Sequence, residues 1–345
     1  MHMADALVSP AVGGTMIAVS GAAIAYSIWK ERKNNQLDER KVPVMGVMSA
    51  FVFAAQMINF TIPGTGSSGH IGGGILLAAL LGGGPALLCL TAVLVIQCLL
   101  FADGGLLALG CNIFNMGVIP CLLAYPLLYK PLSGKGMNAK RITLASVLAV
   151  VIGLQLGAFS VVLETKMSGI TMLPFGTFLL LMQPIHLAIG IVEGLVTAAV
   201  LVYVGHARPE LLESARTAQP IDRQISLKRV LAVLGVMALL VGGGLSLFAS
   251  SYPDGLEWSV DGVLKRGETA SIQDDGEPRG IKAQGAVYDA FAGVQQATSV
   301  MPDYAFKDSE NAAGTSVAGV VGSGVTLLVA LGAGALIAKT RRRRA

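Results

Sequence analysis

The sequence predicts an all-α polytopic membrane protein, in which a seven-span bundle is followed by a two-span module with an external polar domain. Charged residues make up 13% of the chain, well below the roughly 25% that is typical of soluble domains. Apolar runs near the ~20 residues of a membrane helix recur, whereas the strands of an outer-membrane barrel would alternate polar and apolar residues. The 43 glycines suit close packing of helices in lipid.

Nine apolar segments are predicted to be membrane spans. They are residues 9–29, 42–62, 71–83, 85–101, 106–129, 142–163, 178–203, 229–249 and 315–338. The third is too short for an ordinary span. If the basic linkers 30–41 and 130–141 are both cytoplasmic, an even number of crossings separates them. We therefore expect 71–83 to cross as a short helix that lines a cavity or packs inside protein.

Basic residues predict how these spans are oriented in the plasma (cell inner) membrane. Lysines and arginines gather in 30–41, 130–141 and 204–229 and in the C-terminal tail. By the positive-inside rule these segments are cytoplasmic, which places Met1 outside and the C-terminus inside. The predicted parts are a transmembrane domain (1–203), a cytoplasmic linker (204–228) and a two-span module (229–345) with an extracytoplasmic segment (250–314).

The segment 250–314 is the only long polar stretch, and it contains eleven acidic and five basic residues. An acidic external segment could raise the local concentration of cations, although salt screens such fields within roughly 10 Å. A solubilising spacer is the alternative interpretation, and the sequence leaves both open.

The dipeptide Met1-His2 is a candidate chelator of metal ions. The α-amine, the His2 backbone nitrogen and the His2 Nδ1 atom can close two fused chelate rings in one plane. A planar nitrogen set suits Ni(II), Cu(II) and Co(II) better than Zn, Mg or Ca. The first thirty residues lack the basic region of a cleaved signal peptide, and Asp5 stands where lysines would be expected. We therefore expect the Met1 amine to be retained.

His70 is the predicted fourth donor. It lies in the glycine-rich loop 63–74, which the topology places on the same outer side as Met1. A neutral imidazole would complete the plane that Met1-His2 leaves open, and the glycines would let an inserted tail approach closely. Two unrelated histidines remain the alternative at this point.

Other polar and small residues are weaker candidates. His186 and Glu193 are seven residues apart and share a helix face, either as a functional intramembrane pair or as a structural hydrogen-bonded pair. His206 lies among cytoplasmic charges and is assigned no role. The small residues Gly46, Ala50 and Ala54 form a face that could contact a membrane partner or pack internally. Four cysteines without CxxC spacing are read as apolar filler: Cys89, Cys98, Cys111 and Cys121.

The sequence lacks common motifs for ATP binding and for catalysis. It contains no GxxxxGK[ST] loop, no nucleophile elbow and no HExxH. The basic tail anchors the topology and does not predict nucleic-acid binding. The chain is therefore predicted not to be an enzyme, and ATP hydrolysis would fall to partner subunits. An intramembrane enzyme based on His186 and Glu193, or a self-sufficient metal channel, is the lower alternative.

Several ordered motifs resemble those of one family. They are Met1-His2-x-x-Asp5, Val42-Pro43-x-Met45-Gly46, Ala54-Ala55-Gln56-Met57-x-Asn59-Phe60, Gly64-Thr65-Gly66-Ser67-Ser68-Gly69-His70, Asp103-Gly104-Gly105, Asn112, Asn115-Met116-Gly117 and His186-x-x-Ile189-Gly190-x-x-Glu193. Residues 1 to about 203 resemble the CbiM/NikM group, the nickel- or cobalt-specific substrate-capture (S) components of energy-coupling-factor importers. Residues 229–345, with Tyr252-Pro253-Asp254-Gly255-Leu256-Glu257, are similar to the accessory subunit CbiN/NikN of PDGLE type.

The resemblance implies a metal site made of the Met1 amine, the His2 amide and imidazole, and the His70 imidazole. It implies that the tail inserts into the helix bundle, although Met3-Ala4 replaces the usual Ile-Pro. The implied partners are a membrane coupling subunit like CbiQ/NikQ and ATPases like CbiO/NikO, in addition to membrane lipid. The transported substrate is expected to be Ni(II), with Co(II) for cobalamin synthesis as the alternative. Possible supporting residues are Asp5, Gln56, Asn59, Asn112 and Asn115.

Overall fold

The computed structural model describes residues 1–33, 39–135, 138–171, 173–221, 226–265, 284–307 and 313–342. Within these ranges six helices are long and apolar enough to cross a membrane. The prediction of an all-α polytopic membrane protein is therefore confirmed. Some residues counted above lie outside the described residues: Arg223, Glu268, Asp274, Asp275, Glu277, Asp308, Glu310, Arg343 and Arg344.

Helix α1 (Pro10–Lys33) lies at the edge of the bundle and is mostly exposed. Its Ile17, Val19, Tyr26 and Trp29 side chains are exposed, as expected of a helix with one face toward lipid, while Val12, Met16 and Ile24 pack against the core. At its basic end the Lys33 ammonium lies 4.8 Å from the centre of the Trp29 ring. Aromatic rings next to lysines are typical of a membrane–water interface.

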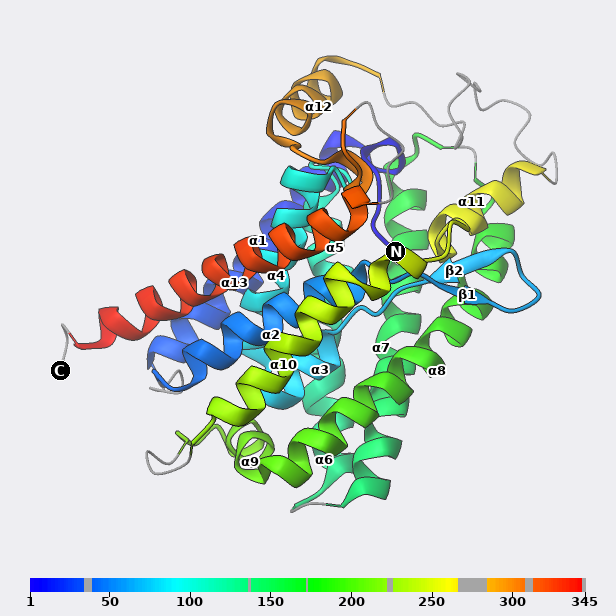
Figure 1. The fold of residues 1–345 in the computed structure, drawn as a ribbon. Helices are drawn as coiled ribbons and strands as arrows, with labels where there is room; N and C mark the ends of the chain where they lie inside the picture. The colour runs from blue at the N-terminus through cyan, green and yellow to red at the C-terminus, as the bar shows by residue number, and fades with distance from the viewer. Residues whose placement is uncertain are drawn as a thin grey trace.

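Helix α2 (Lys41–Gln56) is almost completely buried. It packs against α4 (Gly83–Phe101), α10 (Lys228–Gly243) and α13 (Ala313–Arg342), which surround it in Figure 1. A Cβ on Gly46 would lie 2.6 Å from Leu331 of α13, and the Ala54 methyl lies near Gly242 of α10. These contacts correct the suggestion that Gly46, Ala50 and Ala54 form a face for a partner subunit. The chain's own helices cover Gly46 and Ala54, and Ala50 is buried as well.

The predicted span 42–62 is wrong at its C-terminal end. Helix α2 stops at Gln56, and an antiparallel hairpin follows, made of β1 (Phe60–Ile62) and β2 (Ser67–Gly69) with Phe60 opposite Gly69. The turn contains Gly64 and Gly66 at φ values of 77° and 73°, which glycine adopts at little cost. The hairpin ends directly before His70.

Helix α3 (Gly74–Leu81) corresponds to the predicted short span 71–83. All eight of its residues are buried, and it is only about 12 Å long at 1.5 Å per residue. Its C-terminal Gly82, at φ 89°, lies beside Ala215 of α9 (Pro209–Thr217) and turns the chain into α4. The helix is therefore an interior element, enclosed by protein.

The helix that follows is irregular. It runs through α5 (Leu109–Ile113), the π-helical segment η2 (Phe114–Tyr129) and α6 (Lys130–Ser133). Pro120 and Pro126 lie inside it and remove two backbone donors, which favours a wider turn. The two longest helices, α7 (Ala139–Ser168) and α8 (Phe175–Ala207), then pack along each other on one flank of the molecule.

The segment 250–314 folds onto the bundle where it is described. It contains α11 (Gly255–Lys265), α12 (Ala286–Thr298) and the short turn η4 (Pro302–Tyr304), after η3 (Leu245–Phe248). The Tyr288 hydroxyl donates to the Val8 carbonyl at 3.0 Å, and the Tyr304 hydroxyl donates to Asp103 Oδ2 at 2.5 Å. The first contact joins the segment to the N-terminal tail and the second joins it to the loop after α4, so the segment does more than separate two spans.

Candidate metal centre

The N-terminal tail is inserted into the protein and held there by backbone contacts. The Met3 amide donates to Asn112 Oδ1 at 2.7 Å, and Asn112 Nδ2 donates to the Met3 carbonyl at 3.1 Å. The amide of Gly105 donates to the same carbonyl at 2.9 Å. After the turn η1 (Asp5–Leu7), the chain enters α1. Figure 1 shows the tail ending beside α11 and the hairpin.

Asp5 fastens the tail at a second point. Its Oδ1 atom accepts from the Ala108 amide at 2.9 Å, directly before α5. A side chain on Gly105 would collide with Asp5, which makes a glycine necessary at this approach. Asp5 therefore contacts the loop before α5 and fixes the tail, whereas Asn112 holds Met3 and not the His70 loop that it was suggested to orient.

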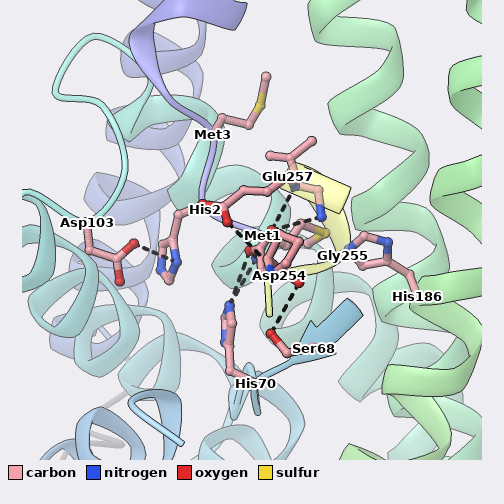
Figure 2. A network of polar contacts seen from close by, with 12 residues as sticks. Met1, His2, Met3, Ser68, His70, Asp103, His186, Asp254, Gly255 and Glu257 are labelled. Carbon is pink, nitrogen blue, oxygen red and sulfur yellow. Dashed lines mark hydrogen bonds and ion pairs between the residues drawn. The ribbon is translucent and has the colours of Figure 1, made fainter. Parts of the chain in front are cut away.

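The Met1 amine lies at the meeting point of three segments that are far apart in the sequence. Its nitrogen is 3.0 Å from His70 Nε2 and donates to Asp254 Oδ2 at 2.5 Å, as Figure 2 shows. The Met1 side chain is 4% exposed and that of Asp254 14%, so the ion pair is largely shielded from water. The structure therefore brings together the amine and the imidazole that were predicted to share a ligand set.

The His2 imidazole stacks on His70 but points its Nδ1 atom elsewhere. The two ring centres are 5.2 Å apart with an angle of 13° between the planes. His2 Nδ1 lies 3.1 Å from Asp103 Oδ1. Without a cation, this carboxylate is the acceptor that the Nδ1 hydrogen can reach, so the planar arrangement expected from Met1-His2 is not closed. Closing it requires a rotation of the His2 side chain away from Asp103.

Burial sets the protonation of the two imidazoles. Loss of hydration lowers the pKa of His2, and loss of hydration together with the neighbouring Met1 ammonium lowers that of His70 well below its usual value. Burial would raise the pKa of Asp254, but the Met1 ammonium outweighs it and the pKa is lowered. Two neutral imidazoles and a carboxylate therefore surround the amine, and neutral imidazole is the form that binds metals.

The loop that contains His70 is fixed from two helices. Gln56 Nε2 of α2 donates to the Gly72 carbonyl at 2.8 Å, and the Gly73 amide donates to Glu193 Oε1 of α8 at 2.9 Å. A Cβ on Gly69 would lie 2.5 Å from Ile189 Cγ1, so only glycine allows the hairpin to approach α8 this closely. Gln56 and Glu193 thus both hold the backbone of this loop.

The hairpin is also joined to the accessory module. The Ser68 amide donates to the Pro253 carbonyl at 2.8 Å, and the Ser68 hydroxyl donates to the Tyr252 carbonyl at 2.7 Å. A parallel bridge between Ser68 and Asp254 continues this pairing. Asp254 Oδ1 in turn accepts from the amides of Leu256 and Glu257 at the start of α11. These bonds place the Asp254 carboxylate against the Met1 amine.

The remaining candidates lie at different distances from this centre. Asn115 Nδ2 donates to Glu164 Oε2 at 2.7 Å and lies 3.8 Å from Met3 Sδ, and among the described residues it is not hydrogen-bonded to the His70 loop. The backbone carbonyl of Asn59 accepts from the Ser250 amide. His186 and Glu193 are not hydrogen-bonded to each other in the part of the chain that the structure describes: His186 Nδ1 lies 2.8 Å from the Met182 carbonyl. The cysteines are buried and unpaired, as expected of apolar filler.

Sequence reasoning assigned no role to Asp103 and Asp254. Each stands directly before a glycine in a quoted motif, Asp103-Gly104-Gly105 and Pro253-Asp254-Gly255, and this was the available signal. Within the described ranges, no group of three or more His, Cys, Asp or Glu side chains is arranged to hold a metal ion. The candidate set differs from such a cluster because it uses two side chains together with the amine and an amide.

The comparisons with known proteins agree with this architecture. Residues 2–211 match the family model CbiM, "Cobalt uptake substrate-specific transmembrane region", and residues 228–339 match the PDGLE domain. A fused nickel transport protein of Archaeoglobus fulgidus is 30% identical over 95% of this chain and 96% of its own length. The fused nickel transport protein NikMN of Rhodobacter capsulatus is 28% identical and covers 99% of each chain.

A cobalt transport protein of Methanocorpusculum labreanum is 31% identical over 56% of this chain and 84% of its own length. The crystal structure of a transition metal transporter is 30% identical, with a TM-score of 0.51 over 63% of this chain and 99% of that one. The fold and the matched motifs are those of a multi-pass, non-catalytic component of transition-metal transport. The chain belongs to the CbiM family and is fused to a PDGLE domain.

Proposed function

We propose that the chain captures Ni(II) on the outer side of the plasma membrane and delivers it inward. The proposed ligands are the Met1 amine, the His2 amide nitrogen, His2 Nδ1 and His70 Nε2. The observation that supports this set most directly is the 3.0 Å distance between the Met1 nitrogen and His70 Nε2. Four nitrogens in one plane favour Ni(II) through its ligand field, and Co(II) is the alternative substrate.

The division into two parts also favours nickel. Two relatives that cover nearly the whole chain are named as fused nickel transport proteins, whereas two cobalt-named relatives cover 56% and 55% of it. We propose that the chain works as the S component of an energy-coupling-factor importer. A coupling subunit like CbiQ/NikQ and ATPases like CbiO/NikO would supply the energy. The positive-inside rule supports Met1 outside and the C-terminus in the cytoplasm.

Titration of the purified full-length protein with Ni(II) and Co(II) tests the metal site. We expect a tight Ni(II) equivalent with the absorption spectrum of planar, diamagnetic Ni(II), and weaker retention of Co(II) in direct competition. The variant His70→Ala should lose the planar spectrum, because three nitrogens remain where four are needed. A six-coordinate spectrum for the tight Ni(II) equivalent of the wild type, or an unchanged spectrum of that equivalent in His70→Ala, would contradict the proposed ligand set.

Deletion of residues 229–345 tests the proposed domains. All four nitrogen donors lie within residues 1–70, so we expect the fragment 1–228 to keep one tight Ni(II) equivalent. A solved truncated relative matches 60% of this chain and 99% of its own length, which supports independent folding of the first part. If the helical circular dichroism spectrum is retained but Ni(II) binding is lost, the site depends on the accessory module and the proposed division is wrong.

A further inference from the structure

A small cavity lies next to the proposed chelate site. Its volume is about 40 Å³, which is room for a cation with a few waters, since one water needs roughly 10–15 Å³ by this measure. Met1, His70 and Asp254 belong to its wall, so it adjoins the amine. The wall also includes three polar residues from the interior of the bundle: Asn115, His186 and Glu193.

His186 belongs to the wall of this cavity and has one ring nitrogen, Nε2, without a hydrogen-bond partner among the described residues. Its Nδ1 atom lies 2.8 Å from the Met182 carbonyl, one turn earlier in α8, and must be the protonated nitrogen because a carbonyl can only accept. Nε2 is then an acceptor. The side chain is 1% exposed, and Nε2 has no hydrogen-bond partner among the described residues. A histidine that donates one N–H to a carbonyl and offers the other nitrogen is oriented as metal-binding histidines are.

Asn115, another residue of the cavity wall, also has an acceptor without a donor. Its Nδ2 atom donates to Glu164 Oε2 at 2.7 Å, which turns Oδ1 away from that carboxylate. Oδ1 is buried and has no partner in the described part of the chain. Buried acceptors without a donor are rare in folded proteins. Two such acceptors on one small cavity indicate an occupant that can satisfy them. A cation would do so by coordination, and a water molecule would do so by donating hydrogen bonds.

The backbone of the PDGLE motif closes the cavity above His186. A Cβ on Gly255 would lie 3.0 Å from His186 Cε1 and 3.3 Å from Nε2, so this position must remain a glycine for the ring to be covered so closely. Figure 2 shows the His186 ring beside Gly255 and Met1. The carboxylate of Asp254 stands at the same wall. A cation in the cavity would therefore lie near a negative charge.

We propose that this cavity is a second, inner position for the transported divalent cation, with His186 Nε2 and Asn115 Oδ1 as its protein ligands. The inference rests on the proposed function, because it takes the cation from the Met1-His2-His70 site as the one that moves inward. One imidazole, one amide oxygen and water form a six-coordinate set that suits Ni(II) or Co(II). With two protein donors instead of four, this position binds more weakly and can release its cation.

Calorimetric titration of the purified full-length protein with Ni(II), followed by X-ray absorption at each plateau, tests the inner position. We expect two equivalents in the wild type: a tight planar one and a weaker six-coordinate one. The variant His186→Phe keeps the ring volume and removes the lone pair, so it should lose only the weaker equivalent. The variant His186→Gln should weaken it at least tenfold. The matched control His206→Phe, at an exposed position of the same helix, should keep both equivalents.

The two proposals fail in different ways in this experiment. If the tight planar equivalent is missing from the wild type, the proposed function is wrong. If the tight equivalent is present but the weaker one is missing, or persists in both His186 variants, the inner cation position is wrong and the cavity holds water only. Retention of the tight equivalent in His186→Phe shows in the same titration that this variant is folded.

Discussion

Replacement of His2 by alanine is expected to lower the affinity for Ni(II) by more than about 100-fold. Loss of a residue that only hydrogen-bonds to a metal ligand costs about 10- to 100-fold in metal affinity, and His2 is itself a proposed ligand. The variant removes the Nδ1 donor and the second chelate ring while it leaves the amine in place. The Met1 amine is anchored independently of His2, by His70 and Asp254. The tail should therefore stay inserted, and the loss should appear in metal binding rather than in folding.

Equilibrium dialysis with metal analysis measures this effect on the purified full-length protein. The matched control is His206→Ala, which removes an exposed histidine at the far end of α8 and should leave Ni(II) binding unchanged. Thermal unfolding without metal should give similar midpoints for both variants. An unchanged Ni(II) affinity in His2→Ala would exclude the chelate and would leave His70 without its proposed partners.

The proposed ligand set would require two changes in the structure on metal binding. The Nδ1 atom of His2 would have to leave Asp103, and the Met1 ammonium would have to lose its proton. If the His2 amide also lost its proton, a divalent cation held by this anion would have a single positive charge, as the ammonium had before. Asp254 therefore faces the same charge in both states and can keep a hydrogen bond to the coordinated amine. This makes Asp254 suitable for holding the tail whether or not metal is bound.

Hydropathy and charge were sufficient to predict most of the helical framework. Eight of the nine predicted segments coincide with helices of more than fifteen residues, and 71–83 corresponds to the buried helix α3. The hairpin was missed because Met57, Ile58, Phe60 and Ile62 extend the apolar segment past Gln56 with only single polar residues between them. A short, partly apolar strand directly after a helix gives nearly the same hydropathy signal as a longer helix.

The sequence predicted the nitrogen donors of the candidate site but not the carboxylates that lie against them. Met1, His2 and His70 could be proposed because each is a nitrogen donor and the predicted topology places them on one side. The contact between Met1 and Asp254 joins residues that are 253 positions apart, and no periodicity or spacing predicts such a pair. The rotation of His2 Nδ1 toward Asp103 depends on a side-chain torsion, which a sequence pattern does not determine.

Lengthening the N-terminus separates the role of the amine from that of His70. The Met1 amine lies in a closed space, and each added residue moves a terminal amine by up to about 3.6 Å. With two alanines ahead of Met1, the amine can no longer close a chelate ring next to His2. We expect this variant to lose the planar Ni(II) spectrum. His70 and the His2 ring are chemically unchanged in it, so the loss would be due to the position of the amine.

With a single added alanine, by contrast, planar Ni(II) binding is expected to be retained. It makes the histidine the third residue, so that the amine, two amides and Nδ1 already provide four nitrogens. Planar Ni(II) should then bind without His70, and adding His70→Ala should change nothing, whereas the same substitution should abolish the planar spectrum at native length. Intact-mass measurement identifies the terminal residue in each preparation. If one and two alanines act alike, or if native-length binding is indifferent to His70, the amine is not a ligand in the arrangement that the 3.0 Å contact indicates.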